Sequence, residues 1–188
     1  MSQALPNGGF KWLNREEINC YMKDELMKTA ADSQVGYMVE VDLDYPDHLH
    51  AWHNDYPLAV ERMGVKMTDL SEFQKEMCNL FNSRPNPSVT KLIPNLYNKT
   101  DYVLHYRNLQ YYIKMGLVLN RIHKVLRFNQ STWLRDFIEY NVEKRKNCAT
   151  SSERDFFKLQ INSNYGRTLL SLRKQLDLRL TTDKAQAK

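Results

Sequence analysis

Three side chains near the C-terminal end of the sequence have the types and the spacing to hold a nucleotide. Lys158, Asn162 and Tyr165 are four and then three residues apart, so in an α-helix they project from one face. Arg154 extends this face by one turn, and Gly166 directly follows the ring. A cation binds phosphate, an amide forms polar contacts, and an aromatic ring offers a stacking surface. The spacing therefore predicts a helix face that grips a nucleotide.

A helical hairpin is expected to carry this face. Thr150 and Glu153 form a T-x-x-E capping box, and no proline interrupts the run that follows, which predicts a helix over 150–172. Its apolar side is expected to pack on a neighbour through Phe157, Ile161 and Leu169. Apolar residues also recur at helical spacing over 130–147. The short gap between the two segments predicts an antiparallel pair of helices.

The rest of the chain predicts a mixed α+β fold. Alternating or β-branched segments predict strands over 36–43, 89–93, 102–106, 117–128 and 176–181. Capping pairs and glycine stops predict further helices over 15–30, 71–83 and 108–115. The turn at 98–101 is expected to join the second and third strands as a hairpin.

The composition is that of an ordinary globular chain. Its 188 residues are 42% hydrophobic and 26% charged, enough to bury the core of one domain or one and a half. The three cysteines are far apart, which disfavours both disulfides and a thiolate zinc site, so we expect a reducing compartment. Neither an apolar run of roughly 18 residues nor a signal-peptide pattern is present. We therefore expect an intracellular protein without a membrane partner.

Charge is distributed unevenly along the chain. Residues 1–104 contain 10 Lys and Arg against 15 Asp and Glu, whereas residues 105–188 contain 17 against 7. The C-terminal part is thus strongly basic and suited to a polyanion, although a solvated basic surface would have the same composition.

The segment Lys158-x-x-x-Asn162-Ser163-x-Tyr165-Gly166 resembles the K-x-x-x-N-S-x-Y-G motif of family B DNA polymerases, which lies on the C-terminal helix of the fingers. Other segments are similar to the protein-primed branch of that family, found in Polinton-like transposons and related viruses. They are Leu5–Trp12, Gly36–Pro46, His50–Leu58 and nearly all of 91–188.

The resemblance implies an α+β architecture made of parts of a polymerase. Residues 1–129 would be a partial palm with a family-specific insertion, 130–171 the fingers hairpin, and 172–188 the return into the palm. The implied activity is templated addition of dNMP to a 3′ hydroxyl. The implied partners are dNTP, a DNA template-primer and a terminal priming protein, in the nucleus or at a site of viral replication.

The same resemblance assigns a role to each matched residue. Lys158 would bind the triphosphate and act in catalysis by protonating the pyrophosphate that leaves. Arg154 and Lys146 would bind phosphate, and Lys144 and Arg145 are neighbouring candidates. Asn162 would support the nucleotide, and Tyr165 would pack beneath the new base pair. Gly166 would let the template approach closely.

The metal-binding motifs of such polymerases have no counterpart in the chain. Two-metal nucleotidyl transfer needs two aspartates that hold Mg²⁺, one in a D-x-x-S-L-Y-P-like motif and one in a D-T-D motif. Asp42-Leu-Asp-Tyr-Pro46 is similar to the first, but its spacing differs. We therefore assign no metal ligands here, expect the Mg²⁺ ligands of a complete enzyme to lie outside these residues, and expect the isolated chain not to polymerise.

Other interpretations remain open at this point. The basic face could be a solvated surface, or it could belong to a non-catalytic nucleic-acid-binding protein derived from a mobile-element polymerase. A metal-dependent hydrolase would use His48, His50 and His53, although a loop cluster without a metal is the simpler interpretation. Base stacking by one or two of the tyrosines between 97 and 112 is a further option.

Overall fold

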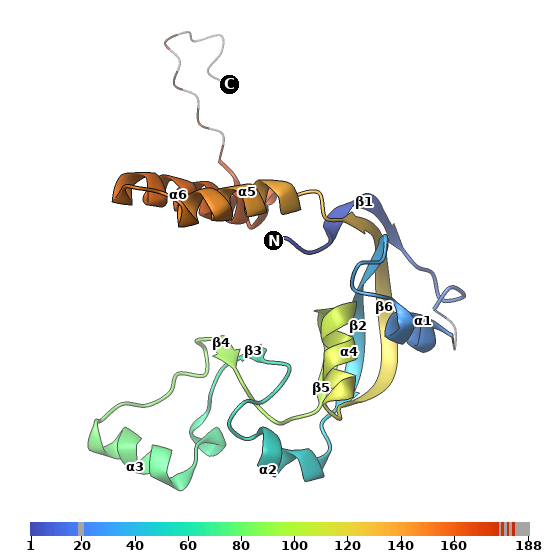
Figure 1. Cartoon of the computed structure of the whole chain (residues 1–188). Coiled ribbons are helices and arrows are strands. Elements are labelled where there is room, and N and C mark those ends of the chain that lie inside the picture. The colour runs from blue at the N-terminus through green and yellow to red at the C-terminus, as the bar shows by residue number, and fades with distance from the viewer. Residues whose placement is uncertain (19–20, 177, 179, 181, 183–188) are drawn as a thin grey trace. The chain divides into compact units, whose positions relative to one another are not determined.

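The computed structural model describes residues 1–188 except 19–20, 177, 179, 181 and 183–188. It divides into two compact units (Figure 1). Residues 6–130 form the first, here called the sheet unit. The second, called the hairpin unit, contains residues 131–188 together with 1–5. The fold is mixed α+β, as predicted, with six α-helices in the described residues.

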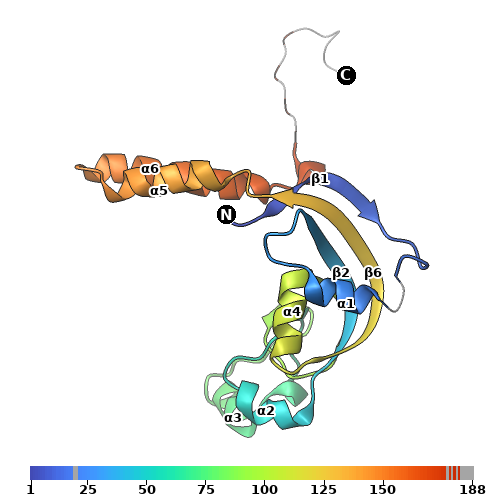
Figure 2. The same cartoon turned by 45° about the vertical axis from the view of Figure 1, so that its right-hand side comes forward.

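A curled four-stranded sheet forms the centre of the sheet unit (Figure 2). Its strands in spatial order are β1 (Leu5–Trp12), β6 (Val118–Ser131), β2 (Val35–Asp44) and β5 (Lys99–His105). The central strand β2 pairs in antiparallel fashion with β5 on one side and with β6 on the other. Hydrogen bonds to both neighbours therefore hold β2 along its length.

The core of the sheet unit lies against one face of this sheet. Val39, Val41 and Leu43 of β2 are at most 1% exposed, as expected for alternating residues of a strand with one covered face. Helices α1 (Met22–Lys28) and α4 (Tyr106–Lys114) contribute buried side chains to the same cluster. On the other face, Glu40 and Asp42 are only half-buried.

Between β2 and β5 the chain forms a smaller substructure. A short helix α2 (His50–His53) leads to β3 (Glu61–Met63), which pairs with β4 (Lys91–Ile93). Helix α3 (Glu72–Leu80) lies between these two strands in sequence. Lys99, at the start of β5, is fully buried, and its Nζ donates to Glu61 Oε2 at 2.8 Å and to Asn95 Oδ1. This ion pair links the substructure to the sheet.

The hairpin unit consists mainly of two helices, α5 (Arg135–Lys146) and α6 (Ser151–Thr168), which lie side by side (Figures 1 and 2). The capping box at Thr150 is confirmed, because Glu153 N donates to Thr150 Oγ1 and Thr150 N donates to Glu153 Oε2. Phe157 and Ile161 are half-buried, as expected for the packed side of α6. Leu169 was wrongly assigned to this side, because it follows the helix and is 66% exposed.

Several predicted elements differ from the structure. The reciprocal bonds between Asn14 and Glu17 form, but they close only a turn, and the helix predicted over 15–30 covers just 22–28 of the described residues. The predicted helices over 71–83, 130–147 and 150–172 are also shorter, and β1 was not predicted. Part of the strand predicted over 176–181 lies outside the described residues.

The hairpin predicted around residues 98–101 is wrong. Residues 99–101 of its supposed turn belong to β5, and the two segments that it was to join pair elsewhere: β4 with β3, and β5 with β2. The polar residues Lys99 and Asp101 suggested a turn. In the structure, however, Lys99 is neutralised by Glu61, and Asp101 lies where the pairing with β2 is irregular.

The buried Lys99–Glu61 pair generates a prediction about stability. Glu61→Gln leaves the buried ammonium group without its counter-ion, so the free energy of unfolding should fall by about 3 kcal/mol. Glu40→Gln is the matched control, because Glu40 pairs with the largely exposed Lys124 and its loss should change stability by less than about 1 kcal/mol. Urea denaturation at neutral pH measures both. Equal losses would contradict the proposed role of Lys99.

Candidate phosphate-binding face of the helical hairpin

The structure places the predicted nucleotide face on α6. Arg154, Lys158, Asn162 and Tyr165 are all exposed, and their positions lie within about 80° of the helix circumference. The packed side of the helix consists of other residues, among them Phe157 and Ile161. The face is therefore a continuous stripe of side chains that is open to a ligand.

Two neighbouring asparagines illustrate how the stripe differs from the rest of α6. Asn164 is half-buried, and its Nδ2 donates to the Gln160 carbonyl at 2.9 Å. Asn162 is exposed, and no side-chain hydrogen bond engages it within the described chain. Its amide is thus available to a ligand, whereas the Asn164 amide already bonds the backbone of the helix.

Three cations meet where α5 ends and α6 begins. Arg145, Lys146 and Arg154 line, together with Val142, an open pocket of about 250 Å³. The predicted phosphate ligands Lys146 and Arg154 are thus brought together, and Arg145, a less certain candidate, joins them. Among the described residues none of the three cations forms an ion pair. Like charges at close range repel, so an anion in this pocket would relieve the repulsion.

The three cations differ in their position relative to the helix dipoles. Arg145 and Lys146 lie in the last turn of α5, where positive charge offsets the dipole, so they also stabilise their own helix. Arg154 lies just after the first turn of α6, beside the positive end of that dipole. Arg154 therefore gains no stabilisation from the dipole of its own helix.

Lys144 and Gly166 occupy different surroundings. Lys144 lies over the ring of Tyr140, with Nζ 5.5 Å from the ring centroid, and it lines a separate pocket. Gly166 lies inside α6, and a Cβ at this position would meet no atom within 4 Å. Packing therefore does not explain why glycine stands there.

The histidines considered as metal ligands gather around Tyr45. His53 Nδ1 and the Tyr45 hydroxyl lie 2.8 Å apart, and His50 Nε2 lies 3.2 Å from the Tyr45 carbonyl oxygen. His53 is buried and His48 is exposed. These contacts favour a packing role for His50 and His53.

The tyrosines divide into buried and exposed side chains. Tyr106 is fully buried, and its hydroxyl donates to the Ala30 carbonyl at 2.9 Å. Tyr102 donates to the Val60 carbonyl at 3.0 Å, and burial raises its pKa to about 12. Tyr97 and Tyr111 are more than half exposed. Of these four, Tyr97 and Tyr111 are therefore the better candidates for base stacking.

Sequence reasoning missed a group of three side chains in the sheet unit: Asp42, Asp101 and His123. They belong to β2, β5 and β6, so no local spacing connects them, and only the pairing of the strands brings them together. The pKa of Asp42 lies below its usual range, first because it accepts the Asp101 N–H and second because its carboxylate pairs directly with the His123 side chain. The expectation of no metal ligands in the chain stays a prediction.

Comparisons of the chain with protein-family models, with curated proteins and with solved structures found no match. A search of the described residues for a helix both long and apolar enough to cross a membrane found none.

The cation pocket predicts binding of a polyanion in which Arg154 takes part. Arg154→Gln should weaken the binding of inorganic tripolyphosphate about 10-fold at low ionic strength, because a charge-assisted hydrogen bond contributes about 1.5 kcal/mol or more. Arg167→Gln removes the same charge from the same helix, but away from the stripe, and should have little effect. Isothermal titration calorimetry measures both. Equal effects would indicate that only net charge matters.

Proposed function

We propose that the hairpin unit is the fingers of a protein-primed family B DNA polymerase and that α6 binds the incoming dNTP. The observation that carries this proposal is the exposed stripe of Lys158, Asn162 and Tyr165 on an unbroken helix, with the cation pocket at its N-terminal end. Phosphoryl transfer depends mostly on positioning and on charge stabilisation, and helix-borne cations supply both.

Each side chain has a distinct role in this proposal. Lys158 binds the triphosphate and delivers a proton to the departing pyrophosphate, while Arg154 and Lys146 hold its phosphates. Asn162 supports the nucleotide, and Tyr165 packs beneath the nascent base pair. The triphosphate lies along Arg154 and Lys158, so the ring of Tyr165 is on the side of the nucleotide base.

The palm assignment for the sheet unit belongs to the same proposal. An antiparallel sheet with α1 and α4 on one face and a half-open second face supports it, because such a sheet leaves a surface on which a template-primer can lie. The Mg²⁺ ions of the reaction would be held by the aspartates of the two metal-binding motifs, which have no counterpart in this sequence. The terminal priming protein is the partner that this branch of the family would need.

The proposal predicts that Lys158 determines affinity for dNTP. In the isolated chain, Lys158→Ala should weaken dNTP binding by about 10 to 100-fold, the effect of losing one charge-assisted contact of about 1.5 to 3 kcal/mol. Arg167→Ala on the other side of α6 is the control. Fluorescence titration with a labelled dNTP gives both affinities, and an unchanged affinity in Lys158→Ala would refute the assignment. Primer extension by the isolated chain with Mg²⁺ should be absent.

A second candidate function is nucleic-acid binding without catalysis. It is favoured by the charge of residues 105–188, with 17 Lys and Arg against 7 Asp and Glu. Binding of this kind weakens with salt in proportion to the phosphates neutralised, and dNTP would not compete with it. Competition between dNTP and a labelled single-stranded oligonucleotide at fixed salt therefore separates the two functions.

Gly166 provides a test in which stability and function should change in opposite directions. Alanine fits the open space at this position, so Gly166→Ala should raise the free energy of unfolding by about 0.5–1 kcal/mol through its higher helix propensity. If the template approaches there, the same change should weaken binding of a primer-template in a longer chain that polymerises. Thermal unfolding and a primer-template titration measure the two effects. Greater stability with unchanged binding would remove Gly166 from the proposed template surface.

A further inference from the structure

Three side chains from three adjacent strands converge on the half-open face of the sheet. His123 Nε2 of β6 lies 2.8 Å from Asp42 Oδ2 of β2 and 3.5 Å from Asp101 Oδ1 of β5. One ligand atom from each residue lies within 4.8 Å of the others. A nitrogen and two carboxylate oxygens at this spacing form a set of donors that a transition-metal ion can use.

Irregular strand pairing produces this convergence. In β6, Lys124 pairs with Glu40 and Ile122 with Val41, so His123 is an extra residue without a partner in β2. In β5, the pairing with β2 shifts between Tyr102 and Lys99, and Asp101 adopts a positive φ of 51°. Both neighbours of β2 therefore bulge beside Asp42. Bulges redirect side chains and occur often next to functional sites.

The distances around His123 suit a shared ion. The buried Nε2 atoms of His53 and His123 both lack a hydrogen bond of regular direction within the described residues, and that of His123 lies 2.8 Å from Asp42 Oδ2. Ligand atoms about 2.1 Å from a common ion lie about 3.0 Å apart at right angles and about 3.4 Å apart in a tetrahedron. The two distances from Nε2, 2.8 and 3.5 Å, are close to these values.

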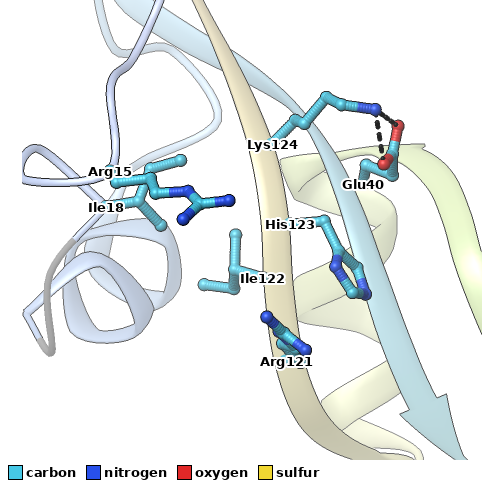
Figure 3. A pocket seen from close by; sticks show the side chains of 7 residues that line it. All are labelled: Arg15, Ile18, Glu40, Arg121, Ile122, His123 and Lys124. Atoms are coloured by element: carbon cyan, nitrogen blue, oxygen red, sulfur yellow. Dashed lines mark hydrogen bonds and ion pairs between the residues drawn. The ribbon is translucent and has the colours of Figure 1, made fainter.

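Neighbouring groups leave these three donors available. Asp101 N donates to Asp42 Oδ1 at 2.9 Å, which orients the Asp42 carboxylate and leaves Oδ2 to face His123. Glu40 is held by Lys124 at 2.8 and 3.0 Å, so it does not compete for the same place (Figure 3). His123 also lines an open pocket of about 500 Å³, which Arg121 and Lys124 line as well (Figure 3).

We propose that Asp42, Asp101 and His123 bind one Zn²⁺ ion on the sheet unit. Two carboxylates balance the charge of the ion, and the imidazole favours zinc over Mg²⁺ or Ca²⁺, which prefer ligand sets made of oxygen alone. Three protein ligands leave a fourth position open for water or another ligand. The site shares no residue with the nucleotide stripe of α6, and its donors differ from the all-aspartate sets expected for Mg²⁺.

Zinc titration of the whole chain tests this proposal. After treatment with EDTA and dialysis, calorimetry at pH 7 should detect one Zn²⁺ per chain. His123→Gln and Asp42→Asn should each weaken binding by about 10-fold or more, since even residues that only support a ligand contribute about 10-fold. Asp44→Asn on the same strand and His48→Gln at an exposed position of a short 3-10 helix are the controls, and they should bind as the unchanged chain does.

Thermal unfolding provides a second readout. Zn²⁺ should raise the midpoint of the unchanged chain and of both controls, but not that of His123→Gln or Asp42→Asn. If one of these variants fails to fold, the other decides. The proposal would be overturned if the chain bound no Zn²⁺ below about 1 mM, or if it bound Mg²⁺ more tightly than Zn²⁺. Undiminished Zn²⁺ binding in folded His123→Gln or Asp42→Asn would also overturn it. Loss of Zn²⁺ in His50→Ala but not in His123→Gln would instead place the ion at the histidines around Tyr45.

Discussion

The sheet unit depends on the pairing of β2 along both of its edges. Val39, Val41 and Leu43 are buried against α1 and α4, so a slip of β2 by one residue would expose this apolar row and bury Glu40 and Asp42. The register is therefore strongly determined wherever the core covers the sheet. Both β5 and β6 nevertheless bulge beside Asp42, next to the buried Val41 and Leu43. The same strand thus determines the core and brings Asp42, Asp101 and His123 together.

Sequence patterns predicted the elements whose cause is local. Alternation identified β2, and the capping boxes at Ser71 and Thr150 identified where α3 and α6 begin, since each of these signals lies within a few residues. Pairing over long distances was not predictable in this way. The segment at 98–101 resembles a turn in composition, but Glu61, far away in sequence, neutralises Lys99 and allows it to be buried in a strand.

The two candidate sites also differ in whether local sequence or distant strand pairing brings their residues together. The stripe on α6 could be predicted because one helix positions all of its residues, and helical spacing alone determines which of them share a face. The pocket of Arg145, Lys146 and Arg154 also depends on the loop between α5 and α6, so its third member was only a weak candidate. Asp42, Asp101 and His123 depend on two bulges in separate strand pairs, for which the sequence offers no local signal.

The three cations where α5 and α6 meet bear on the proposed function. Lys11, Lys99 and Lys124 of the sheet unit and Arg135 of the hairpin unit each pair with a glutamate, so their charges are used within the fold. In the hairpin unit, the described residues offer no such partner to Arg145, Lys146 or Arg154, although acidic residues occur nearby in sequence, such as Glu143 and Asp155. Stability alone would favour pairing these charges. Their convergence without a partner is what a site for an external anion requires, and the triphosphate of a nucleotide meets that requirement.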